Sequence, residues 1–126
     1  MYLIDTNIFL EILLGQEKKE TAKQFLSSHQ GELFITDFTL HSVGVILFRL
    51  KRPEVFLEFI QDVLPNVEVI ALPESEYERV VEFHLKYGLD FDDAYQCAVA
   101  LSKGLTIVTM DEDFRKAPYS VKAIFL

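Results

Sequence analysis

The sequence is poor in the features that mark secreted and membrane proteins. Its only cysteine is Cys97, so no internal disulfide can form and nothing requires an oxidising compartment. The first residues lack a basic segment followed by an apolar one, so they do not resemble a secretory signal peptide. No apolar stretch reaches the roughly 20 residues of a membrane-spanning helix. We therefore expect a cytoplasmic protein with no membrane partner.

Motifs that define several enzyme classes are also absent. There is no G-x-G-x-x-G and no G-x-x-x-x-G-K-[ST], so a nucleotide-binding fold is not supported. The three histidines are scattered and have no metal-ligand spacing. The segment D-T-N (5–7) offers one acid where a phosphoryl-accepting receiver domain needs an acidic pair, and Asn7 stands where a haloacid-type phosphatase needs its second aspartate. These classes are therefore not supported.

Positive charge is scarce. Twelve Lys and Arg residues face twenty Asp and Glu residues, which gives a net charge of −8. Such a chain does not hold nucleic acid by charge alone. The acidity can serve solubility only, or some of the carboxylates can gather around a cation. The positions of the acids in the fold decide between these two interpretations.

Short apolar segments alternate with helical ones along the chain. A length of 126 residues without repeats or linkers predicts a single domain, residues 1–126, with one core. Expected strands cover 2–4, 32–35, 67–72, 106–109 and 120–125. Expected helices cover 9–14, 18–29, 38–50 with Asp37 as N-cap, a stretch from Pro53 to Val63, 73–87 and 92–103, the last two ended by Gly88 and Gly104. This alternation predicts an α/β fold with a central parallel sheet covered on both faces.

Two acids directly follow expected strands. Asp5 comes after the first apolar segment, and Asp111 follows the strand that ends at Thr109. Parallel sheets place their sites beyond the carboxyl ends of the strands. We therefore expect Asp5 and Asp111 to meet at one end of the sheet.

A third acid is predicted from helical phase in the helix over 92–103. Asp93 shares a face with Cys97 and Ala100, a small apolar side that should pack on the sheet. Asp92 instead aligns with Gln96 and Lys103, which we expect to face solvent. Asp93 is therefore the better candidate for a buried carboxylate, and Cys97 is interpreted as a packing residue rather than a nucleophile.

Each of these acids also has a structural explanation as a helix or turn cap. Together they point to a cation, because two like charges about 4 Å apart repel by about 4 kcal/mol at an effective dielectric near 20. Three converging carboxylates therefore need a divalent cation or an extra proton. A set of hard oxygen ligands favours Mg²⁺ or Mn²⁺.

Four segments resemble those of the PIN-domain family in order and spacing. They are "YLIDTNIFLE", "TDFTLHSVGVILFRL", "GLDFDDAYQCAVA" and "LTIVTMDEDF". The similarity covers essentially the whole chain, and the VapC-type toxin ribonucleases of toxin–antitoxin pairs are the subgroup it resembles most. The resemblance implies a three-layer α/β/α sandwich, a Mg²⁺- or Mn²⁺-dependent RNA-cleaving site, a cognate antitoxin and a homodimer.

The resemblance also assigns roles to residues by position. Asp5, Asp93 and Asp111 match the family's first, third and fourth acids, which are its catalytic metal ligands. Asp113 matches an auxiliary acid, and Asn7 and Thr109 match polar residues beside the site.

One position departs from the family pattern. The family usually has a glutamate in the helix after the second strand, and Ser42 stands in its place. Asp37 is no substitute, since five residues of helix rotate it by about 140° from Ser42. Glu11 is a more plausible substitute, although we favour its interpretation as a solvated helix residue.

The expected activity is metal-dependent hydrolysis of single-stranded or structured RNA by the toxin of a toxin–antitoxin pair. A metal ion activates its bound water and neutralises the phosphate. Candidates for contacts with the RNA backbone are Arg115 and Lys116, and also Lys51 and Arg52. The alternative, supported by Ser42, is a catalytically weak or inactive PIN-like module that binds RNA or a protein partner.

Overall fold

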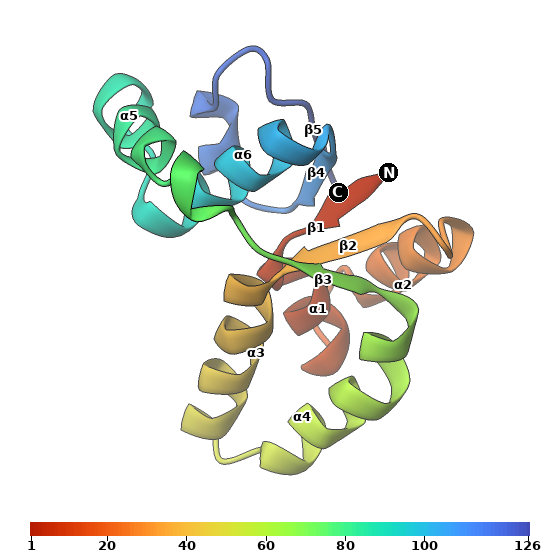
Figure 1. Ribbon diagram of the computed structural model, residues 1–126. Coiled ribbons are helices and arrows are strands. Elements are labelled where there is room, and N and C mark those ends of the chain that lie inside the picture. Colours follow the sequence, from red (N-terminus) through yellow and green to blue (C-terminus); the bar gives the residue numbers. More distant parts are fainter.

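The computed structural model describes residues 1–126 and contains a five-stranded parallel sheet (Figure 1). The order of the strands across the sheet is β3-β2-β1-β4-β5. Their bounds are β1 Tyr2–Ile4, β2 Leu33–Thr36, β3 Glu68–Ile70, β4 Thr106–Thr109 and β5 Ala123–Phe125. The predicted α/β fold with a parallel sheet is confirmed.

Helices cover both faces of the sheet (Figure 1). One face carries α1 to α4, and the other carries α5 and α6. Their bounds are α1 Thr6–Leu13, α2 Lys19–Ser28, α3 Asp37–Arg49, α4 Pro53–Glu58, α5 Glu78–Tyr87 and α6 Phe91–Lys103. A π-helical segment, Phe59–Val63, continues α4. None of these helices has the length and apolar character needed to cross a bilayer.

The two faces of the sheet divide the core into two halves. In β1, Leu3 contributes to the core under α5 and α6, and Ile4 to the core under α1 to α4. The neighbouring strand β4 repeats this division with Ile107 and Val108, which pair in register with Leu3 and Ile4. All four side chains are fully buried, as expected for a parallel sheet covered on both sides.

The ends of the helices follow the sequence in part: α1 begins at Thr6 instead of residue 9, and α5 begins at Glu78 instead of residue 73. Gly88 and Gly104 end α5 and α6 with φ angles of 71° and 67°, which favour glycine, as predicted. The predicted N-cap at Asp37 is wrong. Thr36, the last residue of β2, caps α3 because its hydroxyl accepts the Thr39 N–H at 3.0 Å, and Asp37 is the first helical residue.

The strand order has a topological switch point between β1 and β4. The segment from β1 to β3 builds one side of the sheet, and β4 and β5 then add to the other side of β1. Such a switch point leaves a crevice at the carboxyl ends of the two strands, where ligands of α/β proteins bind. Asp5 follows β1 and Asp111 closely follows β4, so both lie at this crevice.

Candidate metal centre

Asp5 is held firmly at the junction of β1 and α1. Its Oδ1 accepts the Thr6 N–H at 2.8 Å, so it caps α1, and its Oδ2 accepts the Thr109 hydroxyl at 2.7 Å. Burial raises the pKa of Asp5, these hydrogen bonds lower it, and the charge of Asp111 raises it further. The capping role and a role in a site coexist, because Oδ2 accepts only the Thr109 hydroxyl and keeps a lone pair for a ligand.

Asp93 lies in the first turn of α6 and is the most exceptional acid in the molecule. It is 7% exposed, and no hydrogen bond to a protein donor satisfies its carboxylate. Burial and the charges of the four nearby aspartates raise the pKa of Asp93 to about 7. The Asp93 carboxylate opens to a cavity, and its low exposure and the neighbouring negative charges favour the binding of a proton or a cation.

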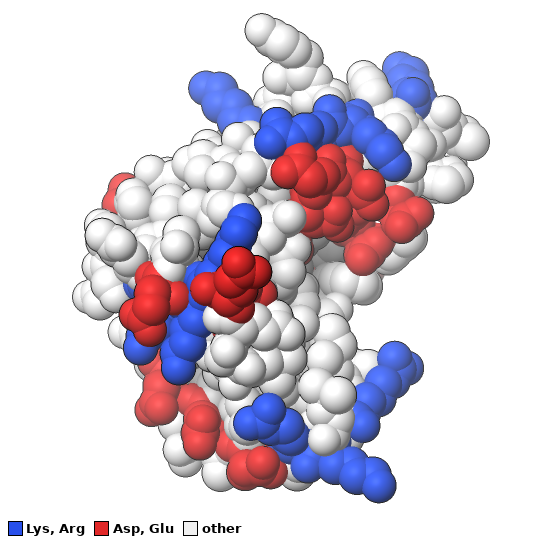
Figure 2. Space-filling model, turned by 180° about the vertical axis from the view of Figure 1, so that it is seen from behind, with Lys and Arg blue, Asp and Glu red and all other residues white.

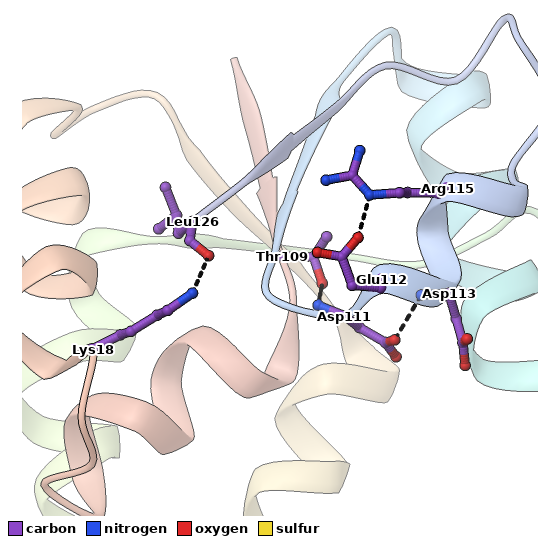
Figure 3. Close-up of polar contacts among 7 residues, drawn as sticks. All are labelled: Lys18, Thr109, Asp111, Glu112, Asp113, Arg115 and Leu126. Atoms are coloured by element: carbon purple, nitrogen blue, oxygen red, sulfur yellow. Dashed lines mark hydrogen bonds and ion pairs between the residues drawn. The ribbon is translucent and has the colours of Figure 1, made fainter.

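Asp111 begins the turn into the short 3₁₀ helix η4, Glu112–Lys116 (Figure 3). Its N–H donates to the Thr109 hydroxyl at 2.9 Å, and its Oδ1 accepts the Asp113 N–H at 2.9 Å. Oxygen atoms of Asp93, Asp111 and Asp113 lie within 4.8 Å of one another. A second triplet, Asp90, Asp92 and Asp93, meets the same limit and shares Asp93.

A cavity of about 190 Å³ opens between these acids. Asp5, Asp92, Asp93 and Asp111 line it together with Ser42 and Asn7, among others. Asp5 belongs to neither triplet but faces the same cavity. The donor set is carboxylate oxygen, which suits Mg²⁺ or Mn²⁺, and the unsatisfied charge of Asp93 is what a divalent cation would neutralise. The residues present therefore fit such an ion.

Gln96 also lines this cavity, although its helical phase predicted that it would face solvent. That expectation is wrong, since Gln96 is 2% exposed. Its Oε1 accepts the Thr36 hydroxyl at 2.7 Å, and its Nε2 donates to Thr39 Oγ1 at 3.0 Å and to Asp5 Oδ1 at 3.4 Å. The side chain thus joins α6 to α3 and β1. The only sequence signal for the buried position of Gln96 is that its amide stands between apolar neighbours in a helix.

The two predicted auxiliary residues Asn7 and Thr109 brace the loop after β4. The Asn7 side chain accepts the Met110 N–H at 3.2 Å and donates to the Thr109 hydroxyl at 3.4 Å. Thr109 in turn donates to Asp5 and accepts from Asp111. This chain of hydrogen bonds connects the two strand ends that carry Asp5 and Asp111.

Glu11 lies outside the cavity lining, unlike Ser42. Its carboxylate accepts the Lys18 N–H at 2.7 Å and so braces the loop between α1 and α2. The Lys18 ammonium donates to the Leu126 backbone oxygen at 2.8 Å (Figure 3). Glu11 is therefore occupied by a structural contact away from the acids.

The predicted RNA-contacting residues fall into two groups. Arg115 pairs with Glu112 (Figure 3). The guanidinium carbon of Arg115 lies 4.0 Å from the Phe125 ring centre, and Lys116 pairs with Asp113 at 3.6 Å. Lys51 and Arg52, at the turn between α3 and α4, are exposed and form no ion pair. Figure 2 shows acidic side chains gathered along one lip of a hollow and basic side chains on the opposite lip, where α3 meets α4.

Cys97 is fully buried behind the site, as predicted. Burial, with the charges of Asp93 and Asp5, raises the pKa of its thiol to about 12. The thiol therefore stays protonated at neutral pH and does not act as a nucleophile.

The fold and this cavity define an α/β protein with an acidic site at the carboxyl end of a parallel sheet. The family model described as PIN domain matches residues 2–118, so the chain belongs to the PIN domain family. No curated protein sequence matches the chain.

Solved structures of similar fold include proteins described as toxins or toxin–antitoxin complexes. A toxin–antitoxin complex from Klebsiella pneumoniae is 23% identical over 97% of this chain and 99% of that chain, with a TM-score of 0.74. VapC20 of Mycobacterium tuberculosis, described as a Sarcin-Ricin loop cleaving toxin, is 20% identical over 91% and 93%, with a TM-score of 0.77. DNA-bound VapBC from Salmonella typhimurium is 17% identical over 98% and 96%, with a TM-score of 0.82. At these identities the likeness establishes a shared fold.

Proposed function

We propose that this protein is a divalent-cation-dependent endoribonuclease that acts as the toxin of a toxin–antitoxin pair. The observation that carries the proposal is the carboxylate of Asp93, which accepts no hydrogen bond from the protein and opens to a cavity it shares with Asp5 and Asp111. Holding its negative charge close to the other aspartates is unfavourable unless a proton or a cation is bound. Membership of the PIN domain family supports nuclease chemistry at this cavity.

The side chains divide the work of phosphodiester hydrolysis. Asp5, Asp93 and Asp111 would hold the Mg²⁺ or Mn²⁺, and Asp113 would supplement them from the rim. When bound, the cation would lower the pKa of a coordinated water and neutralise the phosphate. Thr109 donates a hydrogen bond to the Asp5 carboxylate, which favours its ionised form against the effect of burial and orients it.

RNA would reach this cavity along the hollow in Figure 2. Lys51 and Arg52 are the better candidates for contacts with the RNA backbone, because they have no ion-pair partner. Arg115 and Lys116 are the second pair of candidates. To bind phosphate they would have to break their ion pairs with Glu112 and Asp113. Phosphate contacts made by these four residues would offset the repulsion between RNA and a protein with a net charge of −8. The affinity for RNA should therefore fall as the salt concentration rises.

An antitoxin and a second copy of the chain are the proposed protein partners, in the cytoplasm. The similar structure from Klebsiella pneumoniae is a toxin–antitoxin complex, which supports the antitoxin partner. An apolar groove of about 560 Å³ between α3 and α4 is a suitable contact surface, with Phe48 60% exposed at its rim. Large exposed apolar patches mark protein interfaces.

The test is cleavage of single-stranded RNA by the purified chain with Mg²⁺ or Mn²⁺ and with EDTA. We expect cleavage only with the cation, and a loss of about 100-fold or more in Asp93→Asn, since a metal ligand and its charge are removed. Asp62→Asn is the matched control, because it removes one exposed carboxylate remote from the cavity. Equal cleavage by Asp93→Asn and wild type would rule out this site.

Ser42 favours a second candidate, a PIN module that binds RNA or a partner without efficient cleavage. Its hydroxyl lines the cavity where the family usually supplies a carboxylate. A neutral ligand weakens divalent binding, and a second metal would suffer more than the first. Binding of RNA and metal by wild type without any cleavage would favour this candidate.

A further inference from the structure

Aromatic rings lead away from the acidic cavity along the start of α6. Phe91 is the first residue of α6, directly before Asp92 and Asp93, and it is 58% exposed. Phe38, which lines the acidic cavity, has its ring centre 6.4 Å from that of Phe91. Tyr95 stacks on Phe91 at an interplanar angle of 15°, and the rest of the Phe91 ring is open.

Phe91 also lines a second hollow, which is apolar and has a volume of about 530 Å³. Tyr77, Val81 and His84 of the α5 region form the opposite wall. The hollow therefore adjoins the acidic cavity and shares with it the first turn of α6. Phe91 and Phe38 form a continuous aromatic surface between the two.

We infer that Phe91 and this hollow bind an unpaired nucleobase of the RNA whose phosphate is held at the acidic cavity. The inference rests on the proposed function. Unpaired bases stack on exposed aromatic side chains, and this is how proteins recognise single-stranded RNA. The ring centre of Phe38, which lines the acidic cavity, lies 6.4 Å from that of Phe91, so one nucleotide can reach from the cavity to Phe91.

The charges around Phe91 favour a base over a second copy of the chain. A two-fold contact centred on Phe91 would place this patch against itself. Asp90 and Asp92, the exposed neighbours of Phe91, would then face their own copies and repel them. These carboxylates and Glu78, in the wall of the hollow, also repel phosphate, so the uncharged base would lie against Phe91 with its phosphate turned toward the cation.

The absence of tryptophan from the chain provides a direct test. Phe91→Trp would carry the only indole, and stacking of a base should quench its fluorescence. Stopped-flow mixing with a single-stranded hexaribonucleotide and Mg²⁺ records binding before turnover. We expect quenching by the single strand and none by the same sequence as a duplex. Leu57→Trp, 52% exposed on α4, is the control and should show no quenching by either RNA.

Affinity gives the second measurement. Phe91→Ala should bind the hexaribonucleotide about 5- to 150-fold more weakly, which corresponds to the loss of one stacked base. Phe91→Tyr should retain the affinity. Cleavage by wild type without quenching at position 91 overturns the base site and leaves the nuclease proposal standing. Quenching at position 91 without any cleavage by wild type supports the base site and removes the nuclease proposal. Equal quenching at position 57, or a signal that depends on protein concentration alone, overturns the inference.

Discussion

At the scale of single residues, the raised pKa of Asp93 predicts how the metal-free protein responds to pH. The folded value is about 7, and the unfolded value is about 3.9. Between these values the folded state binds the extra proton, so the contribution of Asp93 to stability falls as the pH rises, by up to about 1.4 kcal/mol per pH unit. This contribution is complete below about pH 4 and is lost above about pH 7. The raised pKa of Asp5 acts in the same direction.

Urea unfolding in EDTA at several pH values from about 4.5 to 7.5 measures this effect. As the pH rises, the free energy of unfolding of wild type should decrease relative to that of Asp93→Asn, so that wild type loses stability. Asp62→Asn, which removes an exposed carboxylate, should follow wild type. A difference between wild type and Asp93→Asn that does not change with pH would mean that Asp93 titrates normally.

A substitution at Ser42 is predicted to increase metal binding and cleavage. Ser42→Glu would add a carboxylate to the cavity and should tighten Mn²⁺ binding and increase cleavage of single-stranded RNA. Glu11→Gln in that background should have little effect, because Glu11 lies outside the cavity. Titration calorimetry and cleavage rates at fixed ionic strength measure both changes. Unchanged Mn²⁺ affinity and cleavage in Ser42→Glu would show that Ser42 does not limit the site.

At the scale of secondary-structure elements, Gln96 is the polar connection between α6 and the rest of the site. Gln96→Leu would leave the Thr36 hydroxyl without its acceptor and remove a donor from Asp5. We expect a loss of about 1–3 kcal/mol in the free energy of unfolding, the usual penalty for an unsatisfied buried group. Denaturant unfolding checks this, with exposed Lys103→Ala on the same helix as the control. A change in Gln96→Leu no larger than in Lys103→Ala would contradict it.

The elements also show which parts of the site could be predicted from the sequence. Asp5 and Asp111 follow parallel strands that end at one edge, so their approach follows from the strand pattern. Gln96 was missed because the helical phase assumed that α6 has a solvated side. In the structure α6 is buried on all sides from Asp93 to Ala100, and no local pattern reveals the covering by α5 and α3. The N-cap of α3 could not be predicted, because Thr36 and Asp37 are both favourable N-cap residues and the choice depends on where β2 ends.

At the scale of the whole molecule, the acidic charge and the cavity predict stabilisation by divalent cations. Binding to the folded state alone raises the free energy of unfolding by about 2.7 kcal/mol at a cation concentration 100 times its dissociation constant. The melting temperature should therefore rise with Mn²⁺ in scanning calorimetry. Asp93→Asn should lose most of this shift, and Asp92→Asn, at the exposed rim, should keep it. An equal shift in Asp93→Asn and wild type would place the cation elsewhere.

The measurement that tests the central claim most directly is anomalous scattering from crystals of the protein soaked in Mn²⁺. The account predicts a peak in the cavity within coordination distance of Asp93 and of Asp5 or Asp111. Soaked crystals of Asp93→Asn should lack the peak. A cavity without a peak at saturating Mn²⁺, or a peak confined to the exposed Asp90 and Asp92, would contradict the proposed metal centre.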